Sequence, residues 1–260
     1  MAISAVILNT LSSNNGANRS QEGRIRRSVL SPQGRTKLNL KSDREFYSHP
    51  RFVTHVDDNF ISTLKNVYRE KLRPNTEILD LMSSWVSHLP EEVKYKRVIG
   101  HGLNAQELAR NPQLDYFFVK DLNSDQKLEL GSGSLDAVLC TVSVQYMQQP
   151  EKVFAEIYRV LREGGVVIVS FSNRMFYEKA VAAWRDASPH GRTQLVVQYF
   201  QAVDGFTQPQ VAKIIPSTEM GPGVGFPSLK WIQKALGLLS PSDPFYSVIA
   251  YKNFTHSTLL

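Results

Sequence analysis

The chain has 260 residues, 42% of them hydrophobic and 10% aromatic, which is enough apolar material for one large folded domain or two small ones. This composition excludes a fully disordered chain and a fibrous repeat, the single cysteine excludes a disulfide framework, and no apolar run approaches the ~18 residues of a transmembrane helix. The formal net charge of +6 lies entirely in residues 1–42, with seven basic residues and one acid, so the remainder is balanced and a nucleic-acid-binding body is disfavoured.

Residues 1–42 have the composition of a targeting segment. They contain seven serines, scattered arginines and almost no acids, which is the pattern of organellar transit peptides. The apolar run 2–8 has no basic region before it, so a secretory signal fits poorly. Large apolar side chains are few, and we therefore expect a disordered segment. The Met-Ala start and the serines favour the chloroplast as the destination, with the mitochondrion as the alternative. An ordinary basic tail without a targeting role is the other interpretation. Residues 43–260 would then form a single domain.

The remaining chain alternates between predicted helices and apolar strands. Apolar side chains spaced three and four apart predict a helix over 57–72, which Pro74 ends. Strands are expected over 77–82, 97–100, 116–119, 135–142, 166–171 and 245–251, and further helices over 104–111, 150–162 and 228–239, with a loop over 219–227. Such alternation indicates a parallel, doubly wound sheet.

Ligands of doubly wound sheets bind at the carboxyl ends of the strands, near the point where the strand order reverses. This places the expected site at the residues that follow the strands, namely 82–87, 101–104, 121–123, 141–146 and 172–176.

Several motifs in this arrangement resemble those of class I S-adenosylmethionine-dependent methyltransferases of type 11. The most specific are GSLDAVL at 133–139, Tyr146, and a helical run that ends in RVLREGG at 159–165. In pattern they are similar to the ubiquinone and menaquinone biosynthesis enzymes. DLMSSWVSHLP at 80–90 and SFSNRMF at 170–176 also resemble a narrower plant and cyanobacterial methyltransferase-like group. The resemblance covers about residues 46–252. It implies a doubly wound, mostly parallel seven-stranded sheet with helices on both faces, and S-adenosylmethionine as cofactor.

The family's three cofactor anchors are only partly kept. Asp80 stands at the acid of the first motif, but its three glycines are replaced by Met82, Ser84 and Val86. The ribose-binding acid after the second strand is replaced by Gly102. The third anchor, an acid near the adenine amine, is Asp121.

Carried over residue by residue, the resemblance implies a set of cofactor contacts: Asp80, Met82, Ser83, Ser84, Gly102, Leu103, Asp121, Leu122 and Ser143. Tyr146, Asn173 and Arg174 are the weaker candidates for contact with the acceptor. His101 or Asn104 could replace the missing ribose contact, and His101 and Tyr146 are the only candidate bases.

Structural interpretations of the same residues stay open beside these. Asp80 could brace its loop without a cofactor, Asp121 could cap a turn, and Arg174 could be salt-bridged. Cys140 is expected to be a buried, inert thiol. His88 and His101 lack the spacing of a metal site, and none is expected.

The first hypothesis is therefore methyl transfer from S-adenosylmethionine to a small-molecule acceptor. Two altered anchors favour the alternative, a non-catalytic scaffold or binding protein on the same fold in the same organelle. A dinucleotide-dependent redox enzyme is disfavoured, because no Gly-x-Gly-x-x-Gly follows the first strand.

Overall fold

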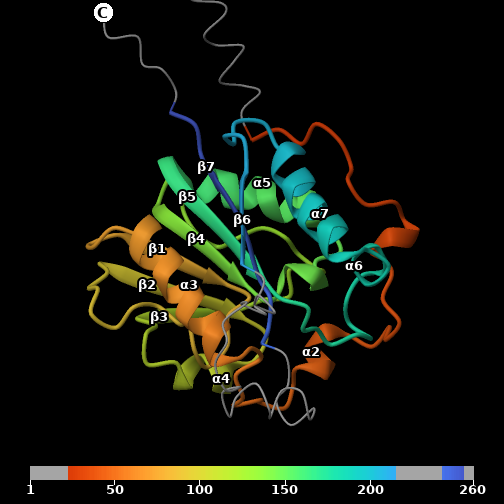
Figure 1. The fold of residues 1–260 in the computed structure, drawn as a ribbon, viewed down its shortest axis with the longest axis horizontal. Helices are drawn as coiled ribbons and strands as arrows, with labels where there is room; N and C mark the ends of the chain where they lie inside the picture. The colour runs from red at the N-terminus through yellow and green to blue at the C-terminus, as the bar shows by residue number, and fades with distance from the viewer. Residues whose placement is uncertain (1–22, 215–241, 255–260) are drawn as a thin grey trace, which may run out of the picture.

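A computed structural model describes residues 23–214 and 242–254. Its centre is a seven-stranded sheet in the order β3-β2-β1-β4-β5-β7-β6 (Figure 1). The strands are β1 Glu77–Leu81, β2 Arg97–Gly102, β3 Tyr116–Val119, β4 Leu135–Thr141, β5 Leu161–Phe171, β6 Gln210–Ile214 and β7 Phe245–Tyr251. Strands β1 to β5 pair in parallel, and β7 runs antiparallel to β5 and β6. The mostly parallel, doubly wound sheet expected from the sequence is confirmed.

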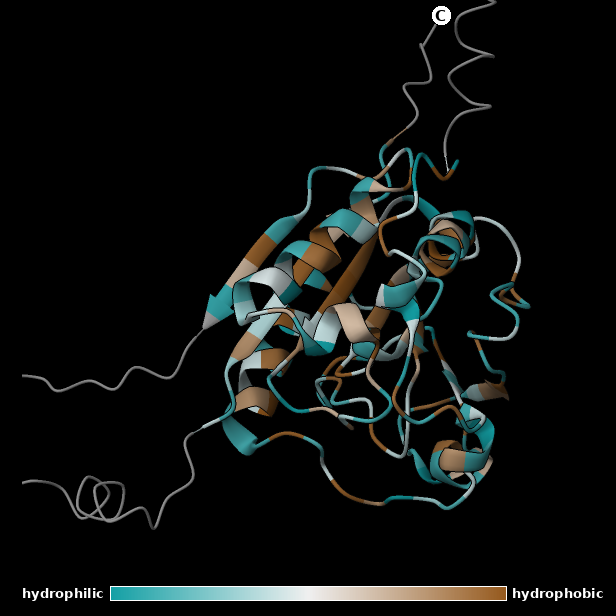
Figure 2. Ribbon diagram, turned by 90° about the vertical axis from the view of Figure 1, so that its right-hand side faces the viewer, coloured by the Kyte–Doolittle hydropathy of each residue, from teal (hydrophilic) through white to brown (hydrophobic). Residues whose placement is uncertain are grey.

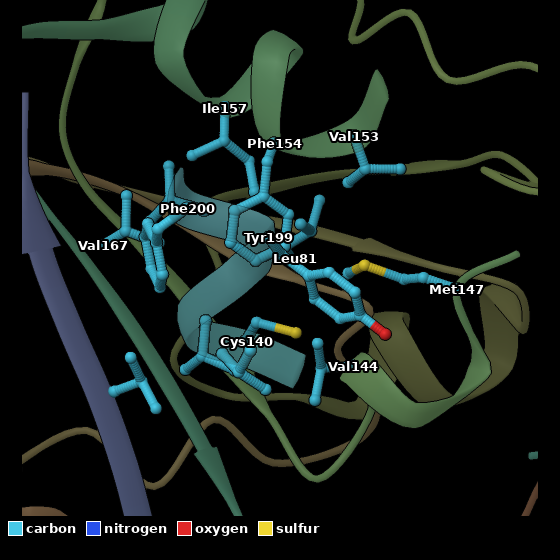
Figure 3. Packing of buried hydrophobic residues seen from close by; sticks show 14 of the residues in the cluster. Leu81, Cys140, Val144, Met147, Val153, Phe154, Ile157, Val167, Tyr199 and Phe200 are labelled. Atoms are coloured by element: carbon cyan, nitrogen blue, oxygen red, sulfur yellow. The ribbon is translucent and has the colours of Figure 1, made fainter. Parts of the chain in front are cut away.

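Helices cover both faces of this sheet. The helices of the described residues are α2 Asp43–Phe46, α3 Asp58–Lys71, α4 Ala105–Arg110, α5 Pro150–Val160, α6 Ala182–Arg185 and α7 Pro189–Gln201, and the 3-10 turns are η1 Gln33–Arg35 and η2 Val144–Tyr146. Phe60, Leu64 and Tyr68 of α3 pack on one face. Helices α5 and α7 cover the other face (Figure 3), where Phe154 meets Phe200 edge to face at 4.8 Å between ring centroids. In the described ranges, no helix is both long and apolar enough to cross a membrane.

The central strands carry the hydrophobic residues that these two layers bury (Figure 2). All seven residues of β5 from Gly165 to Phe171 are buried, and Cys140 of β4 is 1% exposed. Burial raises the pKa of the Cys140 thiol to about 12, so it is an inert core side chain, as expected.

Strand β6 and helix α7 were not predicted. β6 is a short edge strand in which Val211 is 49% exposed, so it lacks the apolar run of a central strand. α7 mixes polar and apolar residues around its axis, but its start carries a signal that was overlooked. The Ser188 side chain caps it and Pro189 occupies its first turn. The loop expected over 219–227 and the helix expected over 228–239 lie outside the described residues.

Residues 23–42, called the N-terminal strap here, contradict the prediction of disorder. Leu30 is 4% exposed, and the Arg35 guanidinium donates to the Glu151 carboxylate at 2.8 and 3.1 Å. The backbone N–H groups of Leu38 and Asn39 donate to the Glu178 carbonyl. The prediction from composition failed because the strap is held by ion pairs and backbone hydrogen bonds to distant residues rather than by a large apolar surface. Residues 1–22 lie outside the described part of the chain.

Candidate functional site

A cavity of about 300 Å³ opens at the carboxyl ends of the parallel strands, where the strand order reverses between β1 and β4. Its walls come from the segments that follow four of these strands, within 80–88, 101–104, 120–123 and 141–147. The structure therefore brings together, at one edge of the sheet, four segments that the sequence pattern had selected. Residues 51–56 and 174–176 complete the wall.

Eleven of the twelve residues proposed from the resemblance line this cavity: Asp80, Met82, Ser83, Ser84, Gly102, Leu103, Asp121, Leu122, Ser143, Tyr146 and Arg174. Asn173 does not. It is exposed and is absent from the wall, although the next residue, Arg174, lines the cavity.

Asp80 is the most deeply placed acid of the cavity. It is 4% exposed, and the Ser83 hydroxyl donates to its carboxylate at 2.5 Å. Burial raises the pKa of Asp80 to about 6, although the hydrogen bonds from Ser83 and Ser87 oppose that shift. The carboxylate thus braces the loop that follows β1, and it also faces the cavity.

Strained backbone is concentrated around the cavity. Among the described residues, only four other than glycine have a positive φ, and three of these line it: Met82 at 58°, His88 at 56° and Val142 at 51°. For L-residues this conformation costs roughly 1–2 kcal/mol, and for a β-branched side chain it is a genuine outlier. Met82 occupies the first glycine position of the family motif, so the chain keeps that backbone shape without the glycine.

His101 cannot serve as the base that the sequence allowed. It is 1% exposed, its Nδ1 accepts the Met82 N–H at 3.2 Å, and its Nε2–H donates to the Lys120 carbonyl at 2.9 Å. Burial lowers its pKa to about 4, so the ring stays neutral. The two hydrogen bonds of His101 thus link the loops after β1 and β3.

The Asn104 side chain is also fully used in hydrogen bonds within the protein. Its Oδ1 accepts the Gln106 and Glu107 N–H groups and caps α4, while its Nδ2 donates to the carbonyls of Tyr47 and Ser48. Neither of the two neutral donors considered for the ribose is therefore available.

Close packing requires a glycine at position 102. A Cβ built at this position would lie 2.6 Å from the Ser83 carbonyl oxygen, which is backbone and cannot easily move. Restoring the family's acid there, a change that the sequence invited, is incompatible with this loop.

We therefore expect Gly102→Asp and Gly102→Ala to lower the free energy of unfolding by about 1–3 kcal/mol, the usual cost of overpacking. Urea unfolding is the measurement. Gly131→Ala is the matched control, because its nearest neighbour would be the Ser134 Cβ at 3.8 Å. A Gly102→Asp protein as stable as wild type would show that the two loops are not packed this closely.

Asp121 combines both of its interpretations. Its carboxylate accepts the Asn123 N–H at 2.9 Å and the Ser124 hydroxyl at 3.1 Å, so it caps the turn after β3. It also lines the cavity and is 9% exposed. A carboxylate oxygen has lone pairs for more than one donor, so capping leaves room for a ligand amine.

Tyr146 and Arg174 have structural partners. The Tyr146 hydroxyl accepts the Phe176 N–H at 2.8 Å, and burial raises its pKa to about 12, so it is no base at neutral pH. The Arg174 Nε pairs with the Asp243 carboxylate at 2.7 Å. Both side chains remain part of the cavity wall.

The segment 43–56 was missed entirely by the sequence interpretation, although it covers one side of the cavity. Arg51 lies among three rings, with its Cζ 4.7, 5.5 and 5.3 Å from the centroids of Phe46, Tyr47 and Phe176. The Arg51 N–H donates to the Glu107 carboxylate at 2.7 Å, and burial raises the pKa of Glu107. The density of aromatic and histidine residues in FYSHPRFVTH, 46–55, was the available signal.

Sheet order, strand direction and cavity position together define a Rossmann-like class I methyltransferase fold. Residues 86–169 match the methyltransferase domain family, and the chain is 41% identical over 63 residues to human thiol S-methyltransferase TMT1B. That second match spans 24% of this chain and a quarter of the relative, 25%.

Solved structures agree on the fold. Phosphoethanolamine N-methyltransferase 2 of Haemonchus contortus, in complex with S-adenosyl-L-methionine, superposes with a TM-score of 0.51 at 14% identity, over 83% of this chain and 61% of that one. The [4+2]-cyclase SpnF gives a TM-score of 0.50 at 16% identity, over 74% and 81% of the two chains. The latter name illustrates that this fold carries more than one chemistry.

Proposed function

We propose that this protein transfers a methyl group from S-adenosylmethionine to a small-molecule acceptor. The observation that carries the proposal is the cavity at the switch point of a methyltransferase sheet, with carboxylates at the ends of β1 and β3. The match of residues 86–169 to a methyltransferase domain supports the same cofactor.

The residues of the cavity fit this cofactor chemically. Its volume of about 300 Å³ is in the range of small-molecule sites. The buried carboxylates of Asp80, Glu107 and Asp121 match the donors of the ligand, which are an ammonium group, ribose hydroxyls and an adenine amine. Glu107 is the acid closest in the chain to the missing one at Gly102, and we assign it the ribose hydroxyls.

The bound cofactor would supply a sulfonium methyl group, which is electrophilic without further activation. The chain's own contribution is alignment and the exclusion of water. Residues 51–56 and 174–176 complete the wall, so an acceptor would be aligned by side chains of this chain.

A specific observation also favours the second candidate, a non-catalytic binding protein. Met82 stands where the family has a bare glycine backbone, and its side chain is partly buried against the core. The organelle is part of the same proposal: we place the protein in the chloroplast, with the mitochondrion as the alternative. Reporters fused to residues 1–22 and to residues 1–45 test this, and a cytosolic signal from both would contradict it.

Replacing Asp121 with alanine tests the cofactor site. We expect the affinity for S-adenosylhomocysteine to fall about tenfold to a hundredfold, which corresponds to about 1–3 kcal/mol for a lost hydrogen bond to a charged group. Isothermal titration calorimetry measures it. Asp186→Ala is the control, because Asp186 is exposed and lies outside the cavity wall.

Because Asp121 also caps a turn, the melting temperature of both variants must be followed. A folded wild-type protein that binds no S-adenosylhomocysteine or S-adenosylmethionine at millimolar concentration would decide for the non-catalytic candidate.

A further inference from the structure

Two histidines of the cavity wall have no hydrogen bond or ion pair in the part of the chain that the structure describes. They are His88, in the loop after β1, and His55, whose ring meets Phe176 edge to face at 5.5 Å between centroids. His101, in contrast, uses both ring nitrogens. An imidazole whose nitrogens have no partner and that lies beside a small-molecule cavity can accept a proton from a bound ligand.

The backbone of His88 is held firmly although its side chain is unpartnered. Gln113 forms two hydrogen bonds to the backbone of Leu89, at 3.1 Å to its N–H and 2.8 Å to its carbonyl. Asn111 donates to the Ser87 hydroxyl at 2.9 Å on the other side. Between these two clamps, His88 adopts the left-handed conformation with φ at 56°. Strain of this kind persists where the surrounding structure imposes it, and it is typical of functional sites.

The electrostatic surroundings keep His88 neutral. Burial lowers its pKa to about 4, and Lys65 of α3 and His55 act in the same direction. Burial, and then the charge of Arg51, also lowers the pKa of His55. Both rings are therefore unprotonated at pH 7 and able to take up a proton.

We propose that His88 is the general base of this site, and that the acceptor is a small thiol or phenol, whose nucleophilic atom loses a proton when it is methylated. The proposal rests on the proposed methyl transfer. The lone pair of the acceptor's sulfur or oxygen forms the new bond to carbon, and the carbon–sulfur bond of the sulfonium donor breaks with its electron pair going to sulfur. The acceptor's proton moves to an imidazole nitrogen of His88 and from there to water.

A weakly basic imidazole suffices for this step. The attacking atom gains positive charge as its bond to carbon forms, so its proton becomes strongly acidic during the reaction. An acceptor that has no proton to lose, such as a sulfide, gains nothing from the base.

The test compares two probes, 2-mercaptoethanol and 2-(methylthio)ethanol, with radiolabelled S-adenosylmethionine. In the second probe a methyl group replaces the proton on sulfur. His88→Asn is the variant, because asparagine tolerates a left-handed backbone. We expect kcat for the thiol to fall about 10²–10⁴-fold, the usual contribution of a general base. The rate for the sulfide and the affinity for S-adenosylhomocysteine should change less than about threefold. His190→Asn, an exposed histidine outside the cavity wall, is the matched control.

A second readout does not depend on turnover. Diethyl pyrocarbonate modifies only unprotonated imidazoles, so at pH 5.5 mass spectrometry should find His88 modified. S-adenosylhomocysteine together with 2-(methylthio)ethanol should protect His88 and leave the modification of the exposed His190 unchanged. If neither probe is methylated, this experiment decides: an unmodified His88 overturns the proposal, and a reactive, protected one supports it. Equal losses for thiol and sulfide would also overturn it. Absence of cofactor binding to wild type would instead refute the proposed function.

Discussion

Asp43→Asn is expected to lower the free energy of unfolding at pH 7 by about 3–5 kcal/mol, the cost of leaving buried charge without its partner. The Asp43 carboxylate lies 2.5 Å from the Nζ of Lys37 and 3.1 Å from that of Lys179. The two lysine side chains are 5% and 0% exposed. Asparagine keeps the shape of the side chain and removes the negative charge that pairs with both lysines.

The loss should depend on pH in a defined direction. Burial already lowers the pKa of Lys37, and Asp43 is the main group that opposes this. Without the carboxylate, Lys37 in the folded protein releases its proton more easily than in the unfolded chain. Stability then rises with pH, so the difference between variant and wild type should shrink from pH 7 to pH 9.5.

Urea unfolding at both pH values measures the effect. Glu45→Gln is the control on the same helix, because Glu45 pairs with Lys41 at 3.0 Å while both side chains are exposed. It should cost less than about 1 kcal/mol. Equal, small losses for the two variants would mean that the lysine cluster is open to water.

Deleting the N-terminal strap is expected to have a comparable or larger effect. A chain that begins at Asp43 lacks Leu30 and Arg35, and it leaves the Glu151 carboxylate, 5% exposed, without its cation. Relative to a chain that begins at Gly23, we expect a loss of about 3–5 kcal/mol from the broken pair alone. If the shorter chain does not fold, Arg35→Ala in the full chain carries the test.

The pH dependence of stability distinguishes the contribution of the Arg35–Glu151 ion pair from that of apolar packing. Burial alone would raise the pKa of Glu151, but the hydrogen bonds from Arg35 and the Val29 N–H hold it below its ordinary value. The stability that Glu151 contributes is therefore present above its unfolded pKa and is lost as the pH falls through the folded one. The cost of Arg35→Ala should be smaller at pH 4 than at pH 7. A cost independent of pH would contradict the assignment.

Periodicity and apolar runs were sufficient to predict six of the seven strands, all except the edge strand β6. The pattern of β5 and the face of α3 depend on nearest neighbours along the chain, so both could be inferred from the sequence. The strap could not, because Arg35 and Glu151 are 116 residues apart and nothing local marks them as partners. The same holds at the site. The sequence identified His101 as a candidate base, but only the fold shows that the loops after β1 and β3 use both of its nitrogens.

The strap has a consequence for how the chain is made. The partners of the strap are synthesised long after it. Glu151 follows Arg35 by 116 residues, and Asp204 follows Arg26 by 178 residues. At about 5–20 residues per second, that delay is on the order of ten seconds or more. Throughout this interval the arginines that later brace the folded domain are held by none of these partners on the growing chain. A factor that recognises basic segments would therefore have access to them during translation and would lose it once folding is complete.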